Sequence, residues 1–325
     1  MTETFANFHR NYFCKCLFLG GRMKQFKFFL TVLLIAFVFS SLFAQENSDE
    51  DTLKGKGIKV TIFNKRTYRL LKHMKHPSVS IYSGFNNPTY SALSSTKDFN
   101  TQNFASISLG YTEIETHQSK TGTEYSIIEN DGLFLENYSS KWKIQNNTNI
   151  DAKMWRFGIR FGDEGYGYRI GKNNYLFFTH SNTLNWSKFD VENLSSFVPP
   201  DSHLFNVFAS QFRFGTSFNS GISLVLLNTL SLDLLYERSI IFPGHKFWYW
   251  AGSSLIEGVS MLLLNEFIES ILKSNTAVAP VAYGILKGAL SFGIYELRKD
   301  KMNWPFKTSP PLFNETFKFG IKFLL

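Results

Sequence analysis

His117 and Ser119 are the residues whose types and spacing come nearest to a catalytic arrangement. They lie two positions apart in the stretch THQSKTG, a spacing that places both side chains on one face of a β-strand. A histidine beside a serine can act as the base that activates the hydroxyl as a nucleophile, if an acid or amide orients the imidazole. A polar loop between strands gives the same residues, so both interpretations stand. His180 and Ser181 are adjacent, which in a strand points them to opposite faces.

A second chemical feature is the basic stretch KRTYRLLKHMKHP near the N-terminus. Its cations could attract lipid or lipopolysaccharide phosphates, or could simply be solvated. They are Lys65, Arg66, Arg69, Lys72 and Lys75. The two histidines of the stretch, His73 and His76, have no cysteine or carboxylate nearby that would complete a metal site. We predict no metal site, and without a phosphate loop or dinucleotide fingerprint we predict no cofactor.

The start of the chain predicts export. From Met23, two lysines precede an apolar run over residues 28–39, and small residues up to Ala44 precede an acidic segment. This pattern is typical of a secretory signal peptide over residues 23–44, cleaved before Gln45. Residues 1–22 are then an upstream extension and residues 45–77 a basic N-terminal segment. An uncleaved anchor is the alternative, but the apolar run is shorter than the roughly 18 residues of a spanning helix.

Removal of the leader changes how the charge and the cysteines are interpreted. Both cysteines, Cys14 and Cys16, lie before the predicted cleavage position, so the mature chain has no disulfide framework and no thiolate metal site. Part of the formal net charge of +8 also belongs to the leader. We therefore do not interpret the charge as a nucleic-acid footprint.

Two-residue alternation dominates the rest of the sequence and predicts β-strands with one apolar and one polar face. Aromatic residues make up 17% of the chain, including 35 Phe and 14 Tyr, which favours strands or aromatic surfaces that meet lipid. The clearest alternating runs are residues 58–63, 78–85, 105–112, 154–162, 212–218 and 230–237.

Turn signals separate these runs and set the expected number of strands. They fall at residues 130–132, 163–165, 172–174 and 219–221. With unequal connections between them, we count roughly ten strands, and predict an all-β antiparallel barrel of about 8–12 strands over residues 78–325. A secreted β-sandwich is the alternative.

The C-terminal stretch TFKFGIKFLL carries a resemblance. Its alternate apolar residues run to the last position, with Gly320 and two lysines on the other face. This resembles the terminal strand of outer-membrane β-barrel proteins of Gram-negative bacteria, and the FAQ end of the leader resembles Bacteroidota-type secreted proteins. The resemblance implies an insertion signal, recognised by the barrel-insertion machinery, made of Phe317, Phe319, Gly320, Ile321, Phe323 and Leu325. We expect the apolar members to face lipid and Gly320 to accept lysine more readily than Ile321.

One region breaks the strand pattern. Residues 248–288 are predicted to form a helical insert that plugs the barrel, caps a rim or lies in the membrane interface. We expect Ser253 or Ser254 to cap its first helix and Lys273 to lie in that helix's last turn. A strand is expected to follow near residues 290–294.

Together these features predict an exported transmembrane β-barrel in contact with outer-membrane lipids. The expected function is non-enzymatic: a small pore, a lipid- or envelope-binding barrel, or a surface structural protein. One alternative is an outer-membrane lipid hydrolase, which the chain resembles in the His117–Ser119 spacing, although Lys120 and Thr121 follow where those enzymes have Asn-Gly. Another is a soluble periplasmic β protein.

Overall fold

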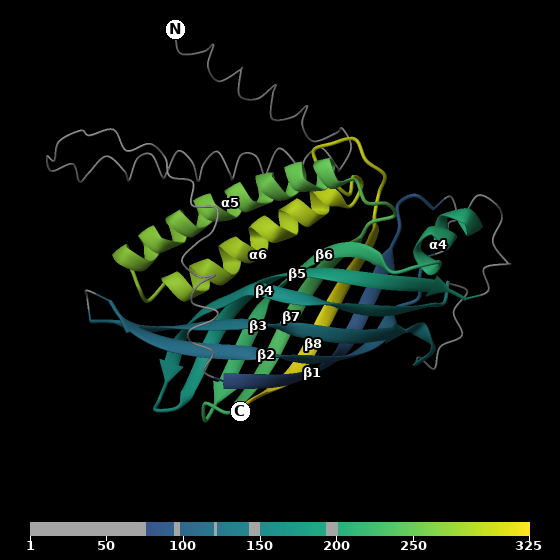
Figure 1. Cartoon of the computed structure of the whole chain (residues 1–325). Helices are drawn as coiled ribbons and strands as arrows, with labels where there is room; N and C mark the ends of the chain where they lie inside the picture. Colours follow the sequence, from purple (N-terminus) through teal and green to yellow (C-terminus); the bar gives the residue numbers. More distant parts are fainter. Residues whose placement is uncertain (1–75, 94–97, 120–121, 143–149, 193–200) are drawn as a thin grey trace, which may run out of the picture. The chain divides into compact units, whose positions relative to one another are not determined.

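Eight antiparallel strands form a closed barrel in the computed structural model, which describes residues 76–93, 98–119, 122–142, 150–192 and 201–325 (Figure 1). Each strand pairs with its neighbours in sequence, and β8 pairs back onto β1. The strands are β1 (His76–Thr89), β2 (Gln102–Gln118), β3 (Glu124–Ser139), β4 (Ala152–Ile170), β5 (Asn174–Val191), β6 (Arg213–Leu226), β7 (Leu230–Ile241) and β8 (Leu312–Leu324). The predicted antiparallel barrel is confirmed. The leader, the basic cluster Lys65–Lys75 and the expected strand at 58–63 lie outside the described residues.

The two ends of the barrel differ in their connections. At the end that holds His76 and Leu324, the strands are joined by residues 119–123, 171–173 and 227–229. The tight turn at Leu227 and Asn228 uses two consecutive left-handed residues, with φ of 54° and 60°, as type I′ hairpins do. At the other end the connections are long, and residues 242–311 hold a helical insert. We call these the short-turn end and the long-loop end.

Several predicted turns are in fact irregular positions inside long strands. Residues 130–132 lie within β3 at a register shift against β4, and residues 163–165 follow a second shift against β5. Gly162, with φ of 58°, takes the left-handed position that such a bulge requires. Residues 219–221 run straight through β6, and only the turn at 172–174 is close to its predicted place. Because these signals do not end strands, the barrel has eight long strands, at the lower end of the predicted range of about 8–12.

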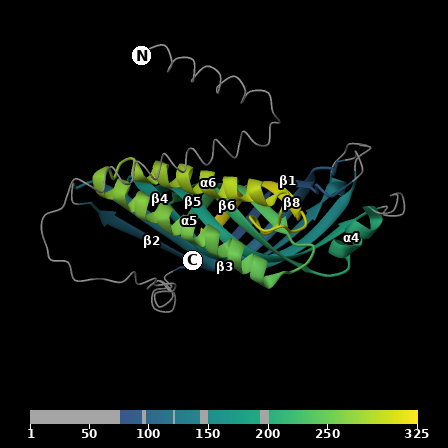
Figure 2. The ribbon, with the colours of Figure 1, turned by 90° about the horizontal axis from the view of Figure 1, so that it is seen from above.

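The insert forms two antiparallel helices, α5 (Phe247–Ser274) and α6 (Ala279–Arg298), on the outside of the barrel. The helix α6 contacts β4, β5, β6 and β7, and α5 packs on α6 (Figures 1 and 2). The predicted strand near residues 290–294 is wrong, because buried residues recur at helical spacing up to Arg298. The expected serine cap is also wrong: α5 begins at Phe247, and Ser253 lies inside it. Lys273 does occupy the last turn.

The helices α5 and α6 owe their ends to local signals. Pro280 stands in the first turn of α6, where its missing N–H costs nothing, and Arg298 ends the helix, where a cation is favourable. Among the described helices, none combines the length and the hydropathy needed to cross a membrane.

Aromatic side chains close the long-loop end. Inward residues of the strands pack against residues of the long connections and of helix α4 (Asp201–Ala209). Phe99 makes edge-to-face contacts with Phe189 and Phe205 at centroid distances of 5.4 and 5.8 Å, and Tyr90 does the same with Phe208 at 5.4 Å. The cluster therefore caps the interior at this end.

Candidate functional site

The lumen contains a balanced charge network, nearer the long-loop end. Arg156 on β4 donates through Nε to Glu136 Oε2 at 2.6 Å and through Nη2 to Glu237 Oε1 at 2.5 Å. Lys318 on β8 lies 2.8 Å from the same Glu136 and 2.7 Å from the same Glu237. Two cations and two carboxylates thus neutralise one another across β3, β4, β7 and β8. Tyr138 adds a hydrogen bond to Glu136 at 2.7 Å and contacts Arg156.

This network occupies the cross-section of the lumen. Arg156 is fully buried, and its ion-pair partners are almost fully buried. All of these side chains point to the barrel axis. Buried charges persist when they are paired and hydrogen-bonded, and here each has two or more partners. The network and the aromatic cap together fill the described part of the lumen, except toward its short-turn end.

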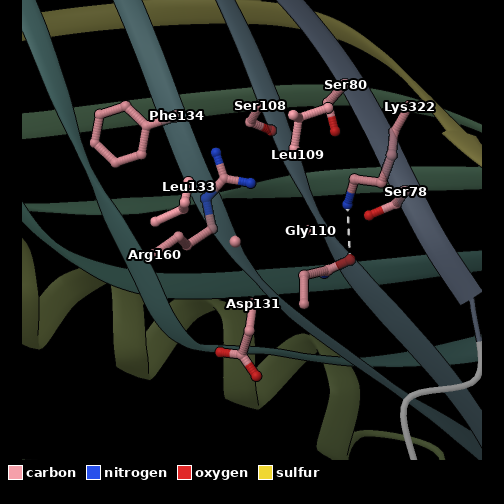
Figure 3. Close-up of a pocket in the computed structure, with 12 residues that line it drawn as sticks. Ser78, Ser80, Ser108, Leu109, Gly110, Asp131, Leu133, Phe134, Arg160 and Lys322 are labelled. Carbon is pink, nitrogen blue, oxygen red and sulfur yellow. Dashed lines mark hydrogen bonds between the residues drawn. The ribbon is translucent and has the colours of Figure 1, made fainter.

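A small polar cavity remains below the network, toward the short-turn end. Figure 3 shows Lys322 and Arg160 reaching into it from different strands, with Ser78, Ser80 and Ser108 around them. Lys322 donates to Asn130 Oδ1 at 2.9 Å and lies 3.8 Å from Asp233. The cavity holds only about 10 Å³ for a solvent molecule, roughly the space of one water. It can hydrate the network but cannot hold a substrate.

The outer wall is divided into two regions. Around β1, β2, β3 and β8 the outward residues are large, apolar and about half exposed. They include Ile81, Phe85, Ile107, Leu109, Leu133, Leu135, Phe317, Phe319, Ile321 and Phe323. We call this region the bare wall. On β5, β6 and β7 the outward positions instead include buried polar residues, and α6 covers them.

The contact between α6 and the barrel, which we call the seam, combines polar contacts with an apolar cluster that includes Phe218, Ile294 and Tyr295. Tyr283 donates to the backbone oxygen of Glu164 at 2.7 Å, and His180 Nε2 lies 2.7 Å from Ser291 Oγ. Nearer the long-loop end, Arg238 on β7 reaches Glu296 on α6 at 2.9 Å.

Arg238 also links α6 to the last strand, and Arg298 links α6 to α5. Arg238 also pairs with Glu315 on β8 at 2.6 Å. Arg298 joins α6 to α5, with Glu257 at 2.8 Å and Ser253 at 2.8 Å.

The hairpin therefore has reversed polarity. Its polar side chains are buried against the barrel or between the helices, while its exposed side is apolar over much of its length. Leu255, Leu262 and Leu263 on α5 and Ile285 on α6 are each about 60% exposed. A helix on a barrel in water would bury its apolar side and expose its polar side.

An apolar groove runs beside the seam. It lies between α6 and the outer faces of β5, β6 and β7 and has a volume of about 410 Å³. Its lining is Phe178, Phe218, Ser220, Gly221, Ile222, Tyr236, Gly284, Ile285, Gly288, Ala289 and Phe292. None of these residues is charged.

The two residues of the predicted hydrolytic pair lie at the end of β2 and in the turn that follows it. The His117 ring, near the end of β2, lies 3.1 Å from the Glu115 carboxylate and stacks on Tyr125. Ser119 stands in the following turn, where its backbone bonds Gly122 and Thr123. His180 and Ser181 do face opposite sides: Ser181 points to the lumen, and His180 points outward to Ser291.

The C-terminal strand faces as expected. Phe317, Phe319, Ile321 and Phe323 point outward, and Lys318 and Lys322 point to the lumen. Their role as an insertion signal stays a prediction. The expected tolerance of Gly320 is wrong, because a Cβ at this position would lie 2.0 Å from the ring of Tyr82. Tyr82 is buried and bonds Asp233 at 2.8 Å, so it has little freedom to move.

The sequence reasoning missed the seam. Arg238 carried the signal for it: the apolar alternation of β7 predicts an outward apolar residue at this position, and an arginine there must be covered or paired. His180 gave a similar signal on β5. Neither could name its partner, because Ser291 and Glu296 lie more than 50 residues away in sequence.

No protein-family model matches the sequence, and no curated protein sequence matches it either. Among solved structures, the chain is similar to Neisserial surface protein A, with 11% identity, a TM-score of 0.35, and coverage of 77% of this chain and 97% of that one. It is also similar to Ail, the attachment invasion locus protein of Yersinia pestis, with 8% identity, a TM-score of 0.30, and coverage of 78% and 100%. At these values the similarity carries no functional conclusion.

Proposed function

We propose that this chain is an outer-membrane β-barrel that acts through its outer wall and its helical hairpin, as a lipid- or envelope-binding protein and not as a pore. The observation that carries the proposal is the reversed polarity of the molecule. Charged groups are paired in the lumen and in the seam, whereas large apolar side chains make up the bare wall and much of the outer side of the hairpin. This is the distribution that suits hydrocarbon around the barrel, and it is costly in water.

The strand lengths agree with this environment. The shortest strand, β7, has 12 residues, and tilted strands need about 9–11 to cross a bilayer. Short turns at one end and long connections at the other are also typical of outer-membrane barrels, in which the short turns are periplasmic. By that rule the hairpin begins at the outer surface and returns along the wall toward the periplasmic side.

The filled lumen favours the two non-enzymatic functions that need no pore. A pore needs a continuous aqueous path, but the Arg156 network and the aromatic cap interrupt it. Binding on the outer wall needs no such path. A lipid hydrolase at His117 and Ser119 stays an untested alternative, since the Glu115 carboxylate, 3.1 Å from the imidazole, is the kind of group that orients a catalytic histidine.

Two measurements on the purified full chain test the proposal. Heat-modifiable migration on a gel after folding into phospholipid vesicles should reveal a membrane-inserted barrel. Planar bilayers containing the protein should show no stepwise conductance, with a porin in the same bilayers as the positive control. A protein that stays soluble and monomeric without detergent would contradict the membrane location. Discrete conductance steps would contradict the closed lumen.

A further inference from the structure

The groove between α6 and the outer faces of β5, β6 and β7 is the feature that the closed barrel and the seam leave unused. Its volume of about 410 Å³ lies in the range of about 300–1,000 Å³ that is usual for ligand sites. The barrel side contributes Phe178, Ile222 and the ring of Tyr236, and the helix side contributes Ile285 and Phe292. We propose that this groove holds an acyl chain of a membrane phospholipid, an inference that rests on the proposed membrane location.

Glycines create the groove. An added Cβ on Gly284 would lie 2.8 Å from Phe178 Cβ, and one on Gly288 would lie 3.0 Å from Ser220 Oγ. The backbone of α6 can therefore come close to β5 and β6, as small residues allow helices to do in membranes. Beside this contact, the larger Ile285 and Phe292 stand 64% and 45% exposed at the mouth of the groove. The result is a narrow recess that is open to the surroundings of the barrel.

The chemistry of the lining selects an alkyl chain. The hydroxyl of Tyr236 is engaged outside the groove, donating to Glu315 at 3.0 Å and accepting from Arg238 at 2.9 Å. Ser220 supplies the other hydroxyl of the lining. The charged residues near the groove are Arg238, Lys287, Glu296 and Glu315, so two cations balance two carboxylates and offer a phosphate no net attraction. A headgroup is therefore not recognised in the groove, and the apolar chain is the part that fits.

Height along the wall indicates which lipid supplies the chain. Phe178 lies four residues from the start of β5 at Asn174, and Ile222 lies four from the end of β6 at Leu226. Both positions are on the short-turn side, whereas Phe218 and Tyr236 lie near the middle of β6 and β7. Since short turns are periplasmic in outer-membrane barrels, a chain that enters at Phe178 and Ile222 comes from the inner leaflet, which consists of phospholipid. The groove is also continuous with exposed apolar residues of β7 such as Leu234.

A second copy of the chain is a less suitable occupant. Eleven residues line the groove, whereas a stable protein interface uses about 20–30 residues a side. A second copy would also have to keep the exposed charges of its α5, such as Glu266 and Glu269, away from this apolar groove.

Photolabelling tests the proposal. The full chain is folded into phosphatidylethanolamine and phosphatidylglycerol vesicles that contain a phospholipid with a diazirine on its acyl chain, and adducts are mapped by mass spectrometry. We expect adducts on residues 284–292 and on β6 to exceed those on the bare wall of β2 and β3. Ala289→Trp, which fills the groove from an exposed position, should reduce the excess to the level of the bare wall. Leu262→Trp, equally apolar and exposed on α5, should leave the pattern unchanged.

Each other outcome overturns a stated part. Equal labelling all round, insensitive to Ala289→Trp, contradicts the groove but leaves the membrane location standing. Labelling of the bare wall with protection of the groove shows that protein covers it, such as a second copy, and also contradicts the proposal. Absence of all labelling contradicts the membrane location together with the groove. If Ala289→Trp does not fold, Ile222→Trp blocks the same groove from the barrel side and must give the same loss of adducts.

Discussion

The lumen and the seam are both buried and polar, but they are built in different ways. In the lumen, Arg156, Glu136, Glu237 and Lys318 all occupy inward positions of the strands, so pleat alternation and barrel closure bring them together. In the seam, Arg238 and His180 occupy outward positions. At many other outward positions of the strands, the same alternation places apolar residues. Their partners Glu296 and Ser291 come from α6, in the hairpin of residues 247–298 between β7 and β8.

This difference makes the two regions depend on different parts of the molecule. The lumen network needs only the closed barrel. In the proposed membrane location, the outward polar groups of β5 and β7 would face hydrocarbon without α6, and an unpaired polar group there is costly. The hairpin is thus required for the integrity of one part of the wall, while the bare wall needs no cover. The following predictions test this division, beginning with the largest expected effect.

Removing the central cation of the lumen should cost most. Arg156→Leu leaves Glu136 and Glu237 buried with Lys318 as the remaining cation. Loss of one partner from a buried ion-pair network costs about 3–5 kcal/mol. The free energy of unfolding from urea titrations in lipid vesicles measures it. The neighbouring outward substitution Trp155→Leu is the control, since it keeps an apolar residue on the outer face. Equal stability of the two variants would contradict the structural role of the network.

A charge on the bare wall should be the next most costly. Ile321→Lys places an ammonium group on the outer face of β8, at a cost of about 2–4 kcal/mol near the bilayer midplane. Ile321→Phe is the control and should be tolerated. The folding yield into vesicles is the measurement. If the lysine variant folds as well as the phenylalanine variant, the bare wall does not face lipid and a water-soluble barrel becomes the better description.

The sequence predicted the lumen and the bare wall but not the seam. Strand alternation is a local signal, so it correctly placed Lys318 and Lys322 inside the barrel. It also placed Phe317, Phe319, Ile321 and Phe323 outside. The bulges at Asp131 and Gly162 use the same residue types as turns, and only pairing with neighbouring strands separates the two cases. For this reason the eight strands fall at the lower end of the predicted range of about 8–12.

Contacts between distant segments explain the remaining errors. The tolerance of Gly320 depends on the ring of Tyr82, more than 200 residues earlier in the chain, and no local pattern shows that approach. The position of the hairpin outside the barrel likewise depends on which polar residues pair across it. A sequence shows that Arg238 interrupts an apolar face, but it does not show what covers the arginine.

Loss of the charged contact in the seam should have an intermediate effect. Arg238→Leu leaves Glu296 and Glu315 without their shared cation, but both carboxylates are about one-third exposed. We expect a loss of about 1.5–3 kcal/mol, the usual value of hydrogen bonds to charged groups. Arg169→Leu, at an exposed arginine near a turn, is the control and should change stability by less than about 0.5 kcal/mol.

Trypsin gives an independent readout of the same variant. Arg298 is buried between the helices, so cleavage after it reports that the hairpin has left the barrel. Arg238→Leu should accelerate this cleavage, and Arg169→Leu should not. Unchanged cleavage together with reduced stability would mean that Arg238 supports the barrel and not the attachment of α6.

The smallest effect should come from the neutral contact in the middle of the seam. His180 and Ser291 are both buried and 2.7 Å apart, and replacing one partner leaves the other without its hydrogen bond. His180→Leu or Ser291→Ala alone should cost about 0.5–1.5 kcal/mol. Replacing both should cost less than the sum of the two, because an apolar pair has no unsatisfied group. A double-mutant cycle on the free energy of unfolding measures this coupling.

The same four proteins can be assayed for fatty acid release from phospholipid, since a serine bonded to a histidine beside an apolar groove also has the parts of a nucleophile and its base. We expect no activity in any of them, because Ser291 is fully buried between α6 and the barrel. Activity in the unaltered chain that both single substitutions abolish would show that the pair is catalytic and that the seam opens.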